Sequence, residues 1–157
     1  MRFQICAVAM LLAACSPPAQ TEPEAPAAQV IDPAIATVVT AAMPGVEIVS
    51  AEADGEGEYE VTGTFGGEEY EFDLMGPDGG WRVIEIQRDV AWTDAPDAVR
   101  IAAAAAPDAF EPVHVIESRQ PVDNSIVYAL FKAGVTDAPS MEVRFLDGEA
   151  AVMPPAH

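Results

Sequence analysis

Two segments in which apolar and polar residues alternate, 59–65 and 69–74, constrain the fold of this chain more than any other feature. A period of two residues is typical of a strand that buries one of its faces. Gly66-Gly67 between the segments predict a two-residue hairpin turn, and such a turn fixes the register of the two strands. The predicted pairs are Tyr59–Leu74, Val61–Phe72 and Gly63–Tyr70 on the core face, with Glu60–Asp73, Thr62–Glu71 and Thr64–Glu69 on the other face.

A helix is predicted before this hairpin. Asp32 can cap it, Pro33 suits its first position, and Pro44 ends it after Met43. A second helix is expected to begin after Thr93 or Asp94 and to end near residue 106. The apolar stripes at helical spacing are Ile31, Ile35, Val38, Val39 and Ala42 in the first helix, and Ala98, Ile101, Ala102 and Ala105 in the second.

The predicted elements recur along the chain. Pro44 and Pro107 each separate a helix from a strand, and Asp78-Gly79 and Asp147-Gly148 each follow a strand in which apolar residues alternate with charged ones. Further strands are expected at 81–86, 113–118, 125–132, 140–146 and 149–153. Searching for such recurrences early matters because a missed repeat gives the wrong fold. We therefore expect an α+β fold with two repeats, residues 32–92 and 93–153, each of one helix packed on an antiparallel sheet of three to four strands.

This succession resembles the PepSY-like family, small exported domains akin to the repeats of the β-lactamase inhibitor protein. The residues that carry the resemblance are Pro44, Tyr59-Glu60-Val61, Glu71-Phe72-Asp73, Asp78-Gly79, Pro107, Tyr128 and Asp147-Gly148. The resemblance implies a helix on an antiparallel sheet in each copy. It also implies a binding or inhibitory role in the cell envelope, with proteases as one class of target. The family has no defined catalytic residues to transfer.

Residues 1–14 have the pattern of an export signal. Arg2 is followed by a short apolar run that ends Leu12-Ala13-Ala14 before Cys15. A membrane-spanning helix needs about 20 apolar residues, so this run is too short to be one. Cysteine directly after Leu-Ala-Ala is typical of a lipoprotein signal, in which Cys15 receives a diacylglycerol and an N-acyl chain. The alternative is an ordinary secretory signal in which Cys15 is incidental.

Residues 15–31, rich in Pro, Ala and Glu, are expected to form a flexible tether behind the lipid, and residues 154–157 a short tail. Ser16 after the cysteine resembles signals that direct bacterial lipoproteins to the periplasmic face of the outer membrane. Several acyl chains are needed for stable anchoring, and a triacylated Cys15 meets that requirement. Cys6 would leave with the signal, so no disulfide is expected in the folded region.

The chain carries 26 acidic and 7 basic residues, a net charge of −19. Nucleic acid is bound by neutralising its phosphates with Lys and Arg, so it is excluded as a partner. An anionic membrane would repel the domain, which would be held at the bilayer by its lipid. The charge itself has two interpretations: solubility, or recognition of a basic partner.

Motifs for catalysis or for a resident metal are missing. The sequence contains no Gly-x-Ser-x-Gly elbow, no His-Glu-x-x-His, no Cys-x-x-Cys and no phosphate-binding loop. His114 falls in a predicted strand, where a half-buried structural histidine is the simpler interpretation. We therefore expect a protein that is not an enzyme, has no cofactor besides the lipid, and has no dedicated metal site.

The candidate binding face consists of Glu60, Glu69, Glu71 and Asp73, all on the face of the hairpin away from the core. Like charges directly opposite each other destabilise a hairpin, and Glu60 and Asp73 are such a pair. The functional interpretation is a basic partner or a divalent cation that neutralises this face; the alternative is a solvated sheet face. The leading hypothesis is a non-enzymatic, protein-binding, inhibitory module anchored in the envelope, with a protease or a basic protein as its partner. The second hypothesis is an acidic structural or divalent-cation-binding component of the envelope.

Overall fold

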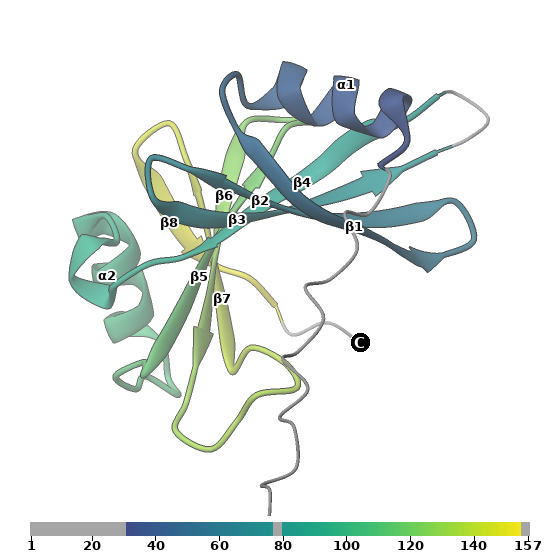
Figure 1. The fold of residues 1–157 in the computed structure, drawn as a ribbon. Coiled ribbons are helices and arrows are strands. Elements are labelled where there is room, and N and C mark those ends of the chain that lie inside the picture. The colour runs from purple at the N-terminus through teal and green to yellow at the C-terminus, as the bar shows by residue number, and fades with distance from the viewer. Residues whose placement is uncertain (1–30, 77–79, 155–157) are drawn as a thin grey trace, which may run out of the picture.

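Eight antiparallel strands form one continuous sheet in the order β1 to β8, and two α-helices accompany it (Figure 1). The computed structural model describes residues 31–76 and 80–154. The predicted signal peptide, Cys15, the tether up to residue 30, the Asp78-Gly79 turn and tail residues 155–157 lie outside the described residues. The elements are α1 (Pro33–Ala42), β1 (Glu47–Gly55), β2 (Glu58–Phe65), β3 (Glu68–Met75), β4 (Arg82–Asp89), the 3₁₀ turn η1 (Trp92–Asp94), α2 (Asp97–Ala105), β5 (His114–Gln120), β6 (Ser125–Phe131), β7 (Met141–Leu146) and β8 (Glu149–Val152).

The prediction of two repeats, each with its own sheet of three to four strands, is wrong. The order of one helix followed by four strands occurs twice, but β4 pairs with β5, from Ile86 opposite Arg119 to Asp89 opposite Ile116. Two separate sheets would each have left an additional edge strand with unpaired backbone groups. Pairing β4 with β5 removes both of those edges and joins all eight strands into one sheet.

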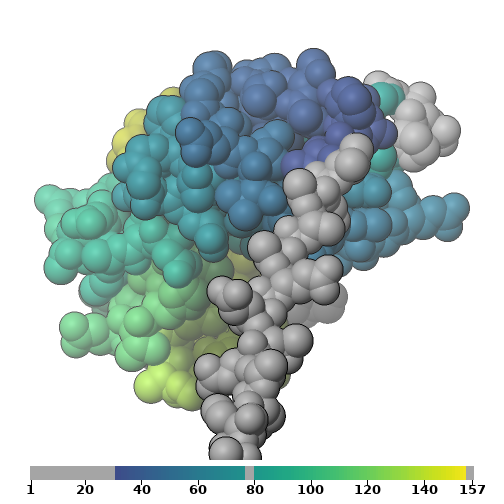
Figure 2. Space-filling view, viewed as in Figure 1, coloured from purple at the N-terminus to yellow at the C-terminus, as the bar shows by residue number. Residues whose placement is uncertain are grey.

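Both helices pack on the same side of this sheet. Ile86 belongs to the core under α1, and it is paired with Arg119, which lies on the same face of β5 as Val115 in the core under α2. The opposite side of the sheet carries no helix in the described chain; we call it the open face. Figure 2 shows that the first half of the chain fills the upper part of the molecule and the second half the lower part.

Two hydrophobic clusters hold the helices to the sheet. The side chains that are almost completely buried in the first cluster come from α1, β2 and β3, and those in the second come from α2 and from β5 to β7. They are Ile35, Val39, Val61, Phe72 and Leu74 in the first cluster and Val99, Ala103, Val115, Tyr128, Leu130 and Val143 in the second.

The prediction for the first helix is confirmed at its start and is one residue too long at its end. Asp32 caps α1, since its Oδ1 accepts a hydrogen bond from the Ala34 amide at 2.8 Å, and Pro33 is the first helical residue. The helix ends at Ala42, before Pro44. Ile35 and Val39 are buried as expected, whereas Ala42 is exposed.

The apolar stripe predicted for the second helix is wrong. Ile101 is 68% exposed, and the buried residues of α2 are Val99 and Ala103, with Ala95 buried just before the helix. The alanine-rich sequence allows either phase, and the structure takes the one in which Val99 contacts the sheet. Ile101 consequently faces away from the sheet.

The hairpin register predicted from Gly66-Gly67 is confirmed at every pair, including Val61 opposite Phe72 and Glu60 opposite Asp73. Gly66 and Gly67 have positive φ angles of 64° and 89°, a conformation that glycine adopts at no steric cost. The register between β3 and β4 contains a β-bulge next to Asp73, so Asp73 pairs with Glu85 whereas Leu74 pairs with Val83. This bulge determines which β4 residues reach the open face beside the acidic hairpin.

Candidate functional site

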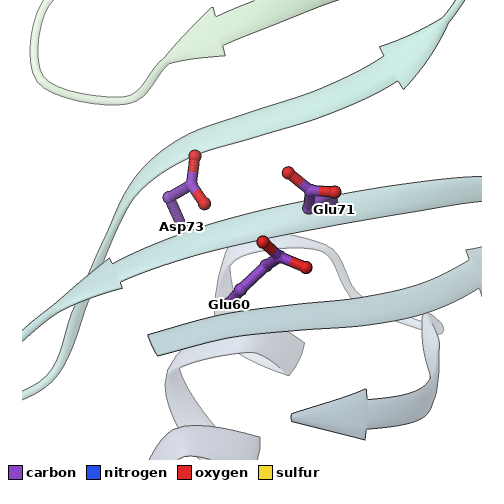
Figure 3. Close-up of side chains that lie close together, drawn as sticks. All are labelled: Glu60, Glu71 and Asp73. Carbon is purple, nitrogen blue, oxygen red and sulfur yellow. The ribbon is translucent and has the colours of Figure 1, made fainter. Parts of the chain in front are cut away.

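Three carboxylates meet on the open face of β2 and β3. Glu60 projects from β2, and Glu71 and Asp73 project from β3 on the same side of the sheet (Figure 3). One carboxylate oxygen of each lies within 4.8 Å of the other two. Side chains alternate between the two faces along each strand, so every second residue faces the same side of the sheet. We call these three residues the acidic triad.

The triad is electrostatically unfavourable at neutral pH. Partial burial, followed by the charges of Asp73, Asp54 and Glu52, raises the pKa of Glu60. Partial burial also raises the pKa of Glu71, with Glu60 and Asp73 as the next largest causes. Among the described residues, no Lys or Arg forms an ion pair with the triad. The carboxylates therefore repel one another without an internal cation to offset the repulsion.

β4 contributes two further polar residues that the sequence analysis missed. Gln87 donates from Nε2 to Asp73 Oδ2 at 2.9 Å. Glu85 pairs with Asp73 across the strands, adds to the rise in the pKa of Glu71, and accepts a hydrogen bond from the buried Ser118 hydroxyl. Their alternation in the strand was visible in the sequence, but the bulge between β3 and β4 made their register unpredictable.

Glu69, the fourth residue of the predicted binding face, lies on the open face but outside the triad. It lines a hollow of about 360 Å³ at the β2–β3 turn end, together with Glu71, Asp89 and Ile116. The acidic surface thus extends from the triad on β2 and β3 to the ends of β4 and β5. All four predicted face residues lie on the same side of the sheet, and three of them converge.

A different carboxylate, Glu117, is buried on the helix side at the junction between β4 and β5. It accepts hydrogen bonds from Arg88 Nε at 3.1 Å and from the Tyr128 hydroxyl at 3.2 Å. Burial alone would raise the pKa of Glu117, but the hydrogen bond and charge of Arg88, together with the charge of Arg119 and the hydrogen bond from Tyr128, outweigh burial, so its pKa lies below the usual value. Burial and the negative charge of Glu117 raise the pKa of Tyr128 to about 12. The charge of Glu117 is thus offset by Arg88, whereas no cation pairs with the triad among the described residues.

His114 is the first residue of β5. Its Nε2 lies 2.8 Å from Asp89 Oδ1, and its ring stacks on Phe131 with ring centroids 5.0 Å apart. The side chain is 46% exposed. These contacts account for the histidine as a residue that links the ends of β4 and β5.

In residues 31–76 and 80–154, neither helix has the length and apolar character needed to cross a bilayer.

Neither a protein-family model nor a curated protein matches the sequence. The fold is similar to that of a DUF2874 family protein from Bacteroides uniformis ATCC 8492, with a TM-score of 0.58 and 16% identity over 80% of this chain and 88% of that chain. A candidate periplasmic protein from Bacteroides eggerthii DSM 20697 aligns with a TM-score of 0.47 and 18% identity, over 78% of this chain and 86% of that chain. At 16% identity, the first of these similarities shows that this chain shares the fold of the Bacteroides uniformis protein.

Proposed function

We propose that the protein is a non-enzymatic, protein-binding lipoprotein of the cell envelope that recognises a basic partner through the open face of β2 to β4. The observation that carries this proposal is the acidic triad: Glu60, Glu71 and Asp73 lie together without a neutralising cation among the described residues. A Lys or Arg side chain of a partner would relieve that repulsion. The resemblance to PepSY-like domains makes a protease one candidate class of partner.

The location forms part of the same proposal. Export by residues 1–14 and lipidation of Cys15 would place the domain at the periplasmic face of the outer membrane, held there by the lipid because the chain has a net charge of −19. Cys15→Ala is expected to give a soluble or unprocessed product after cell fractionation. Membrane attachment that is unchanged in this variant would contradict lipid anchoring at Cys15.

Capture from detergent-solubilised envelopes tests the binding function. The full-length protein is expected to recover a basic protein at low salt, with recovery reduced at least about tenfold by the double variant Glu60→Gln/Glu71→Gln, since screening and charge removal both weaken such a contact. Glu142→Gln/Glu149→Gln on β7 and β8 is the matched control and should retain the partner. Equal recovery by the triad variant and by this control would exclude the triad as the binding surface.

A divalent cation is the second candidate ligand, and the spacing of the triad favours it. Calcium is held by several carboxylate oxygens at about 2.3–2.6 Å, so oxygens within 4.8 Å of one another can share one ion. Calorimetry with calcium and with magnesium should show heat for the natural protein and none for Glu71→Gln. Absence of both heat and a thermal shift in the natural protein would remove this candidate.

A further inference from the structure

A second concave site lies on the helix side of the sheet, away from the acidic triad. It is a notch of about 400 Å³ between the C-terminal end of α1 and the turn that joins β5 to β6. Ligand sites occupy about 300–1,000 Å³ and combine apolar walls with a few polar groups. The apolar part here comes from Ala42, Ile86 and Ile126, and the polar part from Arg119, Gln120 and Asn124.

This notch differs from the rest of the acidic surface because the one charged residue in its lining is Arg119. Its lining, all of it within the described chain, contains no carboxylate, although the sequence has 26 acidic residues. Asp123, next to the notch, is already held by Arg144 at 2.9 Å. Hydrogen bonds from Ser125 and Arg144 lower the pKa of Asp123 to about 2. An incoming anion would therefore meet Arg119 without a directly competing carboxylate in the lining.

Arg119 has hydrogen-bonding capacity left for a ligand. Its Nε and Nη2 reach Glu117 Oε1 only at 3.4 and 3.3 Å, and Arg88 approaches the same oxygen more closely, at 3.1 Å. The Arg119 side chain is 50% exposed. Arginine has five N–H donors in a planar fork that matches a carboxylate. Glu117 consequently depends mainly on Arg88 and Tyr128, and the outer donors of Arg119 are available.

We propose that this notch binds a small amphiphilic carboxylate, with the carboxylate on Arg119 and the apolar part over Ile86 and Ile126. The end of α1 carries the partial negative charge of its last carbonyl groups, so the carboxylate lies at the Arg119 side and the apolar part at the Ala42 side. The net charge of −19 repels anions at long range, so a ligand without an apolar part, such as acetate, binds more weakly. This site does not depend on the proposed function of the triad.

The probe for this site is 4-propylbenzoate, and 4-propylbenzyl alcohol is its uncharged analogue. Titration of the lipidated full-length protein in dodecyl maltoside micelles, followed by amide NMR shifts, should give a dissociation constant on the order of 1 mM, with the shifts centred on residues 119–126. Micelles without protein correct for partition of the probe. The alcohol and acetate are expected to bind at least about tenfold more weakly, because each lacks one of the two contacts.

Two variants probe the two ends of the notch. Arg119→Gln should weaken 4-propylbenzoate binding at least about tenfold, since the charged hydrogen bonds are lost, whereas Arg100→Gln on α2 removes the same charge elsewhere and should change nothing. Ala42→Leu fills the apolar end without changing charge and should also weaken binding. Undiminished binding by Arg119→Gln, equal binding of the alcohol, or shifts centred on other residues would each overturn the proposal.

Discussion

The two halves of the sheet share an element order but differ in how they manage charge. Residues 32–92 contain 14 acidic and two basic residues, whereas residues 93–153 contain 10 acidic and four basic residues. In the second half, Arg100 pairs with Asp97 and Arg144 with Asp123. The first half gathers its carboxylates on the open face, and one of its two arginines, Arg88, is directed to the helix side to pair with Glu68 and Glu117.

This difference in charge pairing indicates which half is the better candidate for binding a ligand. The second half pairs two of its four basic residues with its own exposed or half-exposed carboxylates. The first half retains three converging carboxylates whose mutual repulsion costs stability. A surface kept at such a cost is a better candidate for ligand recognition than one whose charges are already paired.

The largest effect is expected from truncating the core of the first half. Phe72→Ala removes a completely buried ring and should lower the free energy of unfolding by about 3–5 kcal/mol. Because β4 and β5 join the halves into one sheet, both halves should lose stability together. Denaturant unfolding followed by tryptophan fluorescence measures this in each half separately, with Trp81 packed on the first core and Trp92 on the second.

The control for this comparison is the pair of single-tryptophan backgrounds, Trp92→Phe and Trp81→Phe. In Phe72→Ala, the two probes should report the same midpoint. If the midpoint reported by Trp92 stayed at its original value while that of Trp81 fell, the halves would be independent folding units.

Glu117→Gln tests the neutralised junction. Replacing this buried carboxylate removes charge-assisted hydrogen bonds from Arg88 and Tyr128, which should cost about 2–3 kcal/mol at pH 7. The folded-state pKa of Glu117 is lowered, so its contribution is present above the ordinary carboxyl pKa of 4.5 and is lost as the pH falls through the folded pKa. Urea unfolding at a series of pH values should show the cost shrinking in acid, and the exposed Glu149→Gln should show no comparable cost.

Gly63→Ala probes how closely the first half is packed. A Cβ at this buried position would lie 2.7 Å from Val46 Cγ2 and 3.2 Å from the Glu47 carbonyl oxygen. We expect a loss of about 1–2 kcal/mol, because a neighbouring strand must move to admit the methyl group. Thr62→Ala, on the open face, is the control, and thermal denaturation that ranks the two variants equally would contradict the packing around Gly63.

Local patterns predicted most of the strands and all three residues of the acidic triad. The Gly66-Gly67 turn permits one register, so the opposition of Glu60 and Asp73 followed from the sequence. The joining of the two halves into one sheet could not be predicted from the sequence. The pairing of β4 with β5 depends on backbone N–H and C=O groups, which do not depend on the side chain. Glu85 and Gln87 were missed because a β-bulge sets their register, and the phase of α2 was mistaken because alanine gives weak preference to either face.

The smallest effect, and the one most specific to the first half, is expected from Glu71→Gln. Removing one charge from the triad should raise the free energy of unfolding at pH 7 by about 0.2–1 kcal/mol, the size of a like-charge pair across strands. The folded-state pKa of Glu71 is raised, so the folded protein binds this proton more tightly than the unfolded chain does. The natural protein therefore gains stability as the pH falls through that raised pKa toward 4.5, and the advantage of the variant should disappear there.

Urea unfolding of Glu71→Gln and Glu117→Gln at matched pH values compares the contributions of the two carboxylates to the free energy of unfolding. The substitutions should have opposite signs at pH 7, and both effects should diminish in acid. Glu69→Gln, on the same face but outside the triad, separates the local repulsion from the overall charge of the domain. If Glu69→Gln stabilised the protein as much as Glu71→Gln, net charge rather than convergence would explain the gain, and the triad would lose its standing as a distinct site.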